Sequence, residues 1–224
     1  MTPAQLTGRD RTHIVDVAEP ACALHAHTVG PFLQLRTAAA LAGFDLLAVS
    51  SFREFERQLS IWNRKWSGQA PLNDPQGRPL DPTRLSADER IDAILRWSAL
   101  PGASRHHWGT DVDFIDGRAL APGYRVQLIG AEYVFPGPFA PLAEWLDTHA
   151  ARFGFFRPYR GVLSGVQAEP WHLSFAPVAE PARCRLTCAV LREALQASDL
   201  AGKQAVLARL EELHARYVAS IDWP

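Results

Sequence analysis

Two short polar stretches of the chain contain the residue types that a catalytic metal site needs. They are SRHHWGTDVD at residues 104–113 and EPWH at residues 169–172. Together they offer imidazoles, a carboxylate that can bind a metal, and a second carboxylate that can act as a base. Catalytic zinc sites use three protein ligands and leave one position open for water. The two stretches therefore offer the ligands and the base of such a site.

The first stretch offers His106 and two carboxylates. His106 and Asp113 are seven residues apart, so a turn at Trp108-Gly109 followed by a strand would bring both toward one point. Asp111 shares strand parity with Asp113, and both carboxylates are expected on the same side. One of them could bind the metal while the other orients a histidine or binds substrate.

The second stretch supplies a third ligand and a base. Glu169 and His172 are three residues apart and would face opposite sides of a regular strand, so their convergence requires a bend. Pro170 makes a bend plausible and places Glu169 in the loop before the strand. We expect His172 to be a ligand and Glu169 to be the general base.

Simpler explanations compete with the metal site. A histidine beside a tryptophan is commonly a hydrogen-bonded core residue, and His107 competes with His106, since side-chain chemistry alone does not rank two adjacent imidazoles. Cys22, His25 and His27 form another cluster, but they lack a fourth ligand and a zinc-site spacing. For that cluster we predict capping and packing.

Composition limits the function classes. The chain has 224 residues, 47% of them hydrophobic, a formal net charge of -1 and no block of Lys or Arg. These values fit one sizeable core and disfavour a nucleic-acid partner. No segment has the length and apolarity of a membrane span, and no CxxC pair exists. The N-terminus has no basic start followed by an apolar run, so we expect a cytoplasmic protein, or a periplasmic one if a signal peptide has been removed.

Hydrophobic periodicity and turn signals define the expected elements. Residues 67–87 are rich in Gly, Pro, Asn and Asp, which predicts a long loop without regular structure, suited to a substrate-facing flap. Helices are expected at 31–42, 54–66, 86–97 and 139–153, strands or extended segments at 44–49, 112–115, 124–135 and 155–166, and a C-terminal helical pair at 186–197 and 203–218.

The predicted fold class is α+β, with a small, mainly antiparallel sheet that carries the zinc site and is flanked by helices. The C-terminal helical hairpin is expected to pack on this domain. We accordingly predict a domain at residues 1–180 and a helical extension at 181–224.

The motifs resemble those of a known family. Ser104-x-His106-x-x-Gly109-x-x-x-Asp113 and Glu169-x-Trp171-His172 are similar to the SxHxxGxxxD and ExWH signatures of VanY-like D-alanyl-D-alanine carboxypeptidases. The segment from Ser50 to Gln58 is similar to the SGYRSxxxQ segment of that group, with Ser and Phe in place of Gly and Tyr. The three motifs occur in the expected order, and the resemblance covers residues 31–177.

The resemblance implies a role for each matching residue. Zinc would be held by His106, Asp113 and His172, with Glu169 as base, Arg53 holding the terminal carboxylate of the substrate, and Gln58 and Ser104 hydrogen-bonding the peptide. Asp111 departs from the family, which often has a small residue such as Ala at this position. The additional carboxylate would place more negative charge near the metal.

The function implied is a zinc-dependent carboxypeptidase that releases a C-terminal D-amino acid, D-alanine, from murein stem peptides. The expected cytoplasmic location favours an L,D-carboxypeptidase acting on recycled tetrapeptides, with a D,D-carboxypeptidase acting on pentapeptides as the alternative. A module of the same fold that binds peptidoglycan peptides without cleaving them is a further alternative. Its chemistry would not need Glu169.

Overall fold

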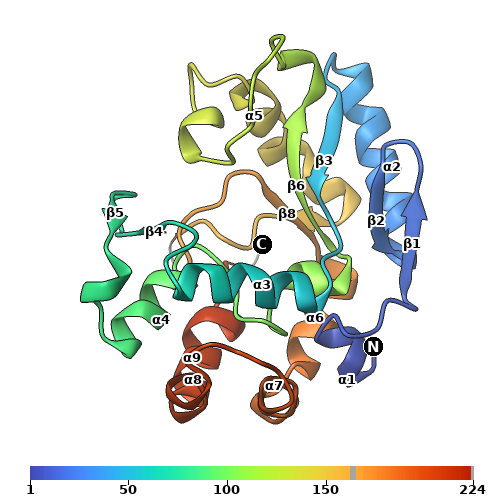
Figure 1. Ribbon diagram of the computed structural model, residues 1–224. Coiled ribbons are helices and arrows are strands. Elements are labelled where there is room, and N and C mark those ends of the chain that lie inside the picture. The colour runs from blue at the N-terminus through green and yellow to red at the C-terminus, as the bar shows by residue number, and fades with distance from the viewer. Residues whose placement is uncertain (162–164, 223–224) are drawn as a thin grey trace.

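The centre of the fold is a four-stranded antiparallel sheet. A computed structural model describes residues 1–161 and 165–222. The sheet has the strand order β3-β6-β8-β7. Its strands are β3 (Leu46–Ser50), β6 (Asp111–Asp116), β8 (His172–Phe175) and β7 (Phe155–Phe156) (Figure 1). The predicted small antiparallel sheet is thus confirmed.

Strand pairing brings the two sequence motifs together. In the β6–β8 ladder Asp113 is opposite His172, and Asp111 is opposite Ser174. On the other edge of β6, Ser50 is opposite Asp113, after an irregularity in the register between Ala48 and Ser50. Residues that are far apart in the sequence therefore become neighbours because three antiparallel strands align them.

The helices lie in two groups, one beside the sheet and one below it in the view of Figure 1. The first group is α2 (Ala26–Leu41) and α5 (Ala140–His149). The second is α3 (Phe55–Trp66), α4 (Ala87–Leu95), α6 (Ala176–Arg185), α7 (Cys188–Gln196), α8 (Lys203–Ala208) and α9 (Leu210–His214).

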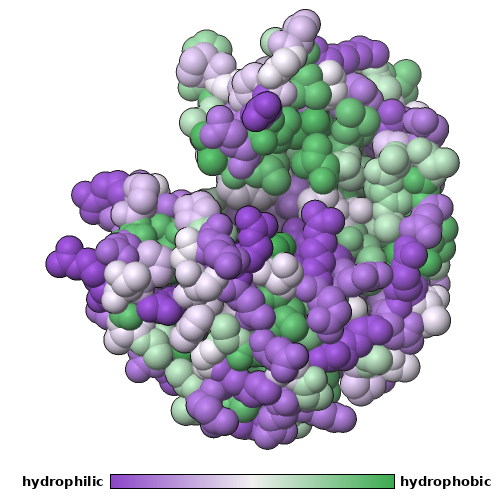
Figure 2. All heavy atoms as spheres, viewed as in Figure 1, coloured by the Kyte–Doolittle hydropathy of each residue, from purple (hydrophilic) through white to green (hydrophobic). Residues whose placement is uncertain are grey.

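Each group of helices has its own buried core. The sheet core combines inward residues of the strands with α2 and α5, and includes Leu46, Val112, Phe114, Leu173, Phe32, Leu35, Leu142 and Leu146. The helical core combines α3, α4, α6 and the C-terminal helices, and includes Phe55, Trp62, Ile91, Ile94, Trp108, Leu191, Leu195 and Leu210. Figure 2 shows the surface hollowed between the upper and lower parts of the molecule.

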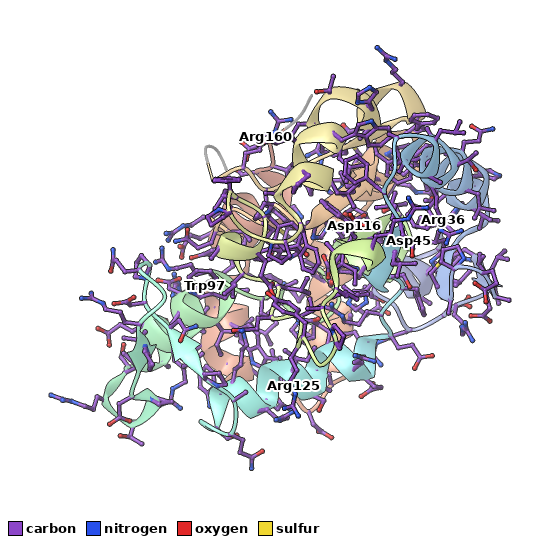
Figure 3. All side chains as sticks on the ribbon, turned by 90° about the horizontal axis from the view of Figure 1, so that it is seen from above. Arg36, Asp45, Trp97, Asp116, Arg125 and Arg160 are labelled. Atoms are coloured by element: carbon purple, nitrogen blue, oxygen red, sulfur yellow. The ribbon has the colours of Figure 1, made fainter. Side chains whose placement is uncertain are left out.

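Polar contacts fix the start of β3 against α2 and β6. Arg36 of α2 contacts Asp45 at 3.1 Å, and the backbone N–H of Asp45 donates to the Asp116 carboxylate at 2.9 Å (Figure 3). Trp97, which follows α4, donates its indole N–H to the carbonyl of Asn73 at 3.2 Å. These bonds position the strands and the end of α4, which border the site described below.

The N-terminal segment differs from the expectation. α1 (Pro3–Leu6) is followed by a hairpin of β1 (Ile14–Val17) and β2 (Cys22–His25). α2 begins five residues earlier than predicted and contains Pro31 within it. The reason is the His25 imidazole, which accepts a hydrogen bond from the backbone N–H of His27 and caps the helix. The capping role predicted for the Cys22, His25 and His27 cluster is thus confirmed for His25.

The segment at residues 67–87 also contains more structure than its composition predicted. β4 (Leu72–Asn73) and β5 (Pro79–Leu80) form a short hairpin, and a 3₁₀ turn follows at Pro82–Arg84. The Asp74 carboxylate accepts hydrogen bonds from the backbone N–H groups of Gln76 and Arg78 and closes the hairpin. The prediction of a loop without regular structure is wrong here, whereas the flap remains a prediction. Ser86 and Glu89 form a capping box that opens α4, at the start of the helix expected from residue 86.

Residues 124–135 were expected to be extended, but they form no strand. A 3₁₀ turn lies at Gly130–Glu132, and the buried Glu132 carboxylate accepts hydrogen bonds from the Tyr124 hydroxyl and from the N–H groups of Gln127 and Ile129. A side chain thus satisfies the backbone groups that a neighbouring strand would otherwise satisfy.

The remaining differences lie toward the C-terminus. Of the strand-turn unit expected at 155–166, only β7 is a strand, and residues 162–164 lie outside the described part of the chain. The helix expected at 203–218 consists of α8, α9 and a π-helical turn at Ala215–Ala219. α6 runs across the division expected between residues 180 and 181, and that division remains a prediction. Within the described residues, no helix combines the length and apolarity required to cross a membrane.

Candidate functional site

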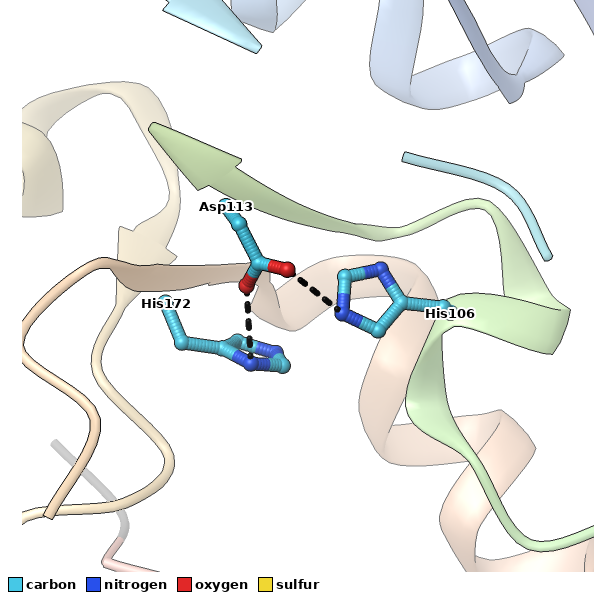
Figure 4. A group of neighbouring side chains, drawn as sticks. All are labelled: His106, Asp113 and His172. Atoms are coloured by element: carbon cyan, nitrogen blue, oxygen red, sulfur yellow. Dashed lines mark ion pairs between the residues drawn. The ribbon is translucent and has the colours of Figure 1, made fainter. Parts of the chain in front are cut away.

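Three of the predicted residues meet at one buried point. His106 lies in a 3₁₀ turn at Arg105–Trp108, Asp113 on β6, and His172 on β8. His106 Nε2 is 3.4 Å from Asp113 Oδ2, and His172 Nδ1 is 3.4 Å from Asp113 Oδ1 (Figure 4). One ligand atom from each residue lies within 4.8 Å of the others, and all three side chains are buried.

The geometry and the donor set fit a small divalent cation. Tetrahedral coordination with metal–ligand distances of about 2.0–2.1 Å places ligand atoms about 3.3–3.4 Å apart, close to the two separations in this cluster. Asp113 Oδ1 is buried and has no hydrogen-bond partner among the residues that the structure describes. An unsatisfied buried carboxylate oxygen is unfavourable, and a cation would remove that cost. Two imidazoles with one carboxylate are also a usual ligand set for catalytic zinc.

The turn that carries His106 also decides which of the two adjacent histidines faces the cluster. His106 Nδ1 is 2.9 Å from the Ser51 carbonyl, which leaves Nε2 toward Asp113. Gly109 ends the turn with φ 66°, and a Cβ there would lie 2.4 Å from Ile14 Cδ1. Glycine is therefore required both for the left-handed backbone and for the close packing.

His107 points away from the cluster into the protein. Its Nδ1 donates to the carbonyl of Arg53 at 2.6 Å, and its Nε2 accepts from the backbone N–H of Gly102 at 3.1 Å. Complete burial lowers the pKa of His107 to about 3, so the imidazole is neutral at ordinary pH. The alternative that His107 replaces His106 in the cluster does not fit this geometry.

His172 is oriented by a carboxylate on the side opposite to Asp113. Its Nε2 lies 2.8 Å from Asp111 Oδ1, which directs Nδ1 toward Asp113. Burial alone would lower the pKa of His172, but hydrogen bonds to Asp111 and Glu169 raise it to about 10. Several carboxylates around one imidazole create an environment that favours a cation. This arrangement matches the expectation that one aspartate orients a histidine while the other faces the metal position.

Asp111 itself lies in a closed polar network. Its side chain accepts hydrogen bonds from Arg105 Nε at 2.9 Å, from the Ser174 hydroxyl at 3.1 Å and from the Thr110 hydroxyl. Burial would raise the pKa of Asp111, but the Arg105 charge and the His172 hydrogen bond hold it below its usual value. The carboxylate is therefore ionised and fully paired.

Glu169 lies beside the cluster because the chain turns immediately before β8. The backbone N–H of His172 donates to the carbonyl of Glu169 at 3.0 Å across Pro170 and Trp171, which is the predicted bend. The N–H of Glu169 donates to the carbonyl of Tyr159 at 3.0 Å. Glu169 Oε2 is 2.9 Å from His172 Nδ1, and its side chain remains 17% exposed. A carboxylate in this position can exchange a proton with a group bound at the cluster.

Arg53 lines the same cavity. Its Nη1 donates to Gln58 Oε1 at 2.8 Å and its Nη2 to the Ser50 hydroxyl at 3.1 Å. Gln58 is fully buried, and its amide also donates to the carbonyl of Ala99 at 2.7 Å. Its contacts thus orient Arg53, while direct hydrogen bonding of a peptide by Gln58 remains a prediction. Ser104 lines the cavity, as expected of a substrate-binding residue.

The cavity has a volume of about 230 Å³ and is lined by every predicted site residue except Gln58, which is buried and hydrogen-bonded to Arg53. Arg53, Ser104, His106, Asp113, Glu169 and His172 all line it. The two tryptophans of the motifs differ, because Trp171 lines the cavity whereas Trp108 is completely buried in the helical core. The indole N–H of Trp108 donates to the carbonyl of Leu6 at 3.1 Å.

A buried His-Asp-His cluster beside a carboxylate is the arrangement of a metal-dependent hydrolase. The VanY D-alanyl-D-alanine carboxypeptidase family model matches residues 21–178. Because the match covers most of the chain, the protein belongs to this family.

Three curated proteins are similar to the chain in sequence, and one of them is a D-alanyl-D-alanine carboxypeptidase. An uncharacterised protein of Haemophilus influenzae is 42% identical over 103 residues, which are 45% of this chain and 70% of that protein. A second uncharacterised protein of the same organism is 35% identical over 121 residues, 53% of this chain and 92% of that protein. A D-alanyl-D-alanine carboxypeptidase of Enterococcus faecalis is 27% identical over 154 residues, 67% of this chain and 47% of that protein.

Solved structures show the same fold. VanYB in complex with D-alanine-D-alanine has a TM-score of 0.52 and 23% identity, over 83% of this chain and 89% of that one. A variant of the D,D-pentapeptidase VanY in complex with Zn(II) has a TM-score of 0.52 and 21% identity, over 86% and 88%. The LD-carboxypeptidase LdcB has a TM-score of 0.50 and 20% identity, over 81% and 67%.

Proposed function

We propose that the protein is a zinc metallo-carboxypeptidase that releases a C-terminal D-amino acid, D-alanine, from murein stem peptides. The observation that carries the proposal is one cavity in which Arg53 faces the His106, Asp113 and His172 cluster beside Glu169. A cation-binding cluster with a base supports hydrolysis, and a guanidinium that lines the same cavity supports recognition of a free carboxylate.

His106, Asp113 and His172 would hold the zinc. A zinc ion in such a site polarises a peptide carbonyl and lowers the pKa of water to about 7. The ion would take the place of the proton that His172 Nδ1 otherwise shares with Glu169 at 2.9 Å. Glu169 is then free to take a proton from the attacking water and to deliver it to the leaving amine.

In this proposal Arg53 binds the free C-terminal carboxylate of the peptide and thereby restricts cleavage to the last residue. A planar guanidinium binds a carboxylate in bidentate fashion, and the contacts of Arg53 with Gln58 and Ser50 hold it in one orientation before substrate arrives. An endopeptidase would not need this clamp. Ser104, which lines the cavity, is assigned to a hydrogen bond with the peptide.

The choice between L,D- and D,D-carboxypeptidase activity is part of the same proposal. One solved structure of this fold is titled an LD-carboxypeptidase and another a D,D-pentapeptidase, and both are similar to this chain in fold. We place L,D activity on recycled tetrapeptides first, with a cytoplasmic location, and D,D activity on pentapeptides as the alternative. Cell fractionation tests the location.

The test is release of D-alanine from tetrapeptide and pentapeptide muropeptides by the zinc-loaded protein. Release from the tetrapeptide alone supports L,D activity, and release from the pentapeptide alone supports D,D activity. Arg53→Met should reduce kcat/KM by at least about 100-fold because it removes a charged hydrogen bond to the substrate, while the zinc content stays near one per chain. Arg53→Lys keeps the positive charge but loses the planar bidentate group, so its kcat/KM should lie between those of the wild type and Arg53→Met.

The non-catalytic alternative makes a different prediction. A module that only binds peptide would release no D-alanine from either substrate, and Glu169→Gln would leave its peptide affinity and its lack of activity unchanged. In the enzyme, Glu169→Gln should abolish release and retain peptide binding. A chain that never binds zinc would refute the proposal outright.

A further inference from the structure

Lys65 is a cation near the cavity that the proposed catalytic steps do not use. It lies in the last turn of α3, seven residues after Gln58, and residues seven apart in a helix lie on the same face. Gln58 contacts Arg53, which lines the cavity. The face of α3 that orients the arginine therefore also carries Lys65, about 10 Å further along the helix axis.

The end of α3 and the loop that leads to Glu169 are both attached to α4. α3 and α4 lie side by side (Figure 1), and Arg90 of α4 donates to the carbonyl of Trp66 at 3.1 Å. Just after α4, the carbonyl of Arg96 accepts a hydrogen bond from the N–H of Gln167 at 3.0 Å. The last turn of α3 and the Glu169 loop thus meet at α4, whose end borders the cavity.

Lys65 lacks a partner for its charge. The residue is half-buried, and its ammonium group has no ion pair or hydrogen bond with residues 1–161 and 165–222, which the structure describes. Burial lowers the pKa of Lys65, and the charge of Glu169 opposes this shift. The ammonium group therefore lies within the electrostatic range of Glu169 without touching it. A half-buried cation in this situation is unfavourable unless a ligand supplies the opposite charge.

The position of the scissile bond indicates which part of a substrate would reach Lys65. In a tetrapeptide the bond that is broken follows the third residue, so the carbonyl of that residue lies at the cluster beside Glu169. The side chain of the third residue begins at the adjacent Cα. Arg53 is already assigned to the C-terminal carboxylate. A charged group at the end of the third side chain is therefore the one that Lys65 can meet.

We infer that Lys65 binds a carboxylate at the end of the side chain that precedes the scissile bond, and thereby selects stem peptides with a diamino dicarboxylic acid, such as diaminopimelate, over those with lysine. The inference rests on the proposed carboxypeptidase function in its L,D form and specifies the substrate class, with D-alanine still the released residue. A carboxylate would pair with Lys65, whereas a substrate lysine would bring a second ammonium group toward it.

The test uses three tetrapeptides that end in D-alanine and differ only at the third residue, with the zinc-loaded full chain. The third residue is diaminopimelate with a free side-chain carboxylate, the same residue with that carboxylate amidated, or lysine. We expect kcat/KM for the free carboxylate to exceed both other values by about tenfold, as a hydrogen bond between charged groups provides. Lys65→Met should bring these ratios to about one, and Lys65→Arg should retain them.

Lys203→Met is the matched control. Lys203 is the other lysine of the chain and is also half-buried, but it lies on α8 and does not line the cavity. Its replacement should leave the ratios unchanged. A wild type without the preference, or a preference that persists in Lys65→Met with zinc bound, overturns the inference.

The stem peptide offers another carboxylate, on the D-glutamate at its second position. Replacing this residue by D-isoglutamine should leave the preference at the third residue intact. If kcat/KM instead depends on Lys65 only through the D-glutamate carboxylate, the assignment to the third residue is wrong.

Failure of the proposed function is distinguishable from failure of the Lys65 contact. Calorimetric binding of the same peptides to zinc-loaded Glu169→Gln reports the contact without catalysis. If no D-alanine is released, but Glu169→Gln binds the free-carboxylate peptide about tenfold more tightly than the amidated one, the contact stands and the hydrolase does not. The double variant Lys65→Met, Glu169→Gln should lose this difference. Equal affinities of Glu169→Gln for the peptides refute the contact whatever the activity.

Discussion

Replacing Asp111 by Ala should weaken zinc binding and destabilise the metal-free protein through two separable effects. The Asp111 carboxylate holds His172 Nε2 at 2.8 Å, and it also pairs with Arg105 Nε at 2.9 Å. The Asp111 and Arg105 side chains are 0% and 3% exposed. Asp111→Ala therefore removes an orienting partner from a candidate ligand and leaves a buried guanidinium without its carboxylate.

The magnitudes follow from these two contacts. Removing a carboxylate that orients a metal-binding histidine weakens metal affinity by about 10–100-fold. Breaking a buried ion pair by removing one partner costs about 3–5 kcal/mol of folding stability. The double variant Arg105→Met, Asp111→Ala removes the unpaired charge, so it should recover most of the stability and none of the zinc affinity.

Zinc affinity would be measured by competition with a chromophoric chelator, and stability by denaturant unfolding of the metal-free protein. Ser174→Ala is a suitable control, because it removes one hydrogen bond to Asp111 but leaves the contact with His172 intact. It should alter zinc affinity by less than about threefold. Unchanged zinc affinity in Asp111→Ala, or recovery of affinity together with stability in the double variant, would refute the orienting role.

Three further outcomes are expected. Gly109→Ala should lower the free energy of unfolding by at least about 2 kcal/mol, because a Cβ would lie 2.4 Å from Ile14 Cδ1 at a residue with φ 66°. Urea unfolding measures this change, and an unchanged midpoint would contradict the close packing. Zinc at about 100 times its dissociation constant should stabilise the chain by about 2.7 kcal/mol in thermal unfolding, and His172→Ala should abolish the shift; a shift retained in that variant would place the zinc elsewhere. Burial lowers the pKa of His107 from 6.5 to about 3, so the folded protein favours the neutral imidazole. The contribution of this group to folding stability is complete above pH 6.5. It decreases as the pH falls from 6.5 toward 3, by at most about 1.4 kcal/mol per pH unit. The difference in unfolding free energy between the wild type and His107→Gln should therefore change with pH in this window, and parallel pH profiles would show that His107 does not titrate as described.

The sheet and the convergence of the motifs were predictable from the sequence because the ligands lie on strands and turns with clear local signals. Alternation in Asp111–Asp116 predicts β6, and Pro170 predicts the turn before β8. Once the two strands pair, the positions of Asp113 and His172 follow from the register. Strand parity also correctly placed Asp111 and Asp113 on the same side, around the His172 ring.

Segments whose backbone N–H groups donate hydrogen bonds to a side chain were not predictable in the same way. The start of α2 depends on the His25 imidazole, an uncommon cap, so the helix-favouring position of Pro31 was misleading. The segment before Glu132 resembles a strand in composition, but its N–H groups bind the buried Glu132 carboxylate. Such bonds depend on where a single polar side chain points, which hydrophobic periodicity does not report.

The contribution of the C-terminal helices to the cavity was also hidden. Leu213 and Tyr217 are four residues apart and share one apolar helical face, and this spacing alone indicates only that the face is buried. In the structure the same stripe is part of the helical core and, at Leu213, Tyr217 and Val218, also a wall of the cavity. Burial against a neighbouring helix and burial against a cavity give the same pattern in the sequence.

The position of the site between the two cores explains why residues from both parts are required. His106 lies in a turn whose Trp108 is buried in the helical core, whereas Asp113 and His172 lie on strands whose apolar residues form the sheet core. The backbone N–H of Arg53 donates to the carbonyl of His106 at 3.1 Å, and the Ser51 carbonyl contacts His106 Nδ1 at 2.9 Å. The segment after β3 thus contains Arg53, for which we propose carboxylate binding, and contacts the candidate ligand His106. A metal ion bound by all three ligands would connect the two cores. In the proposed function, substrate binding, metal affinity and folding stability would then all depend on the same short segment.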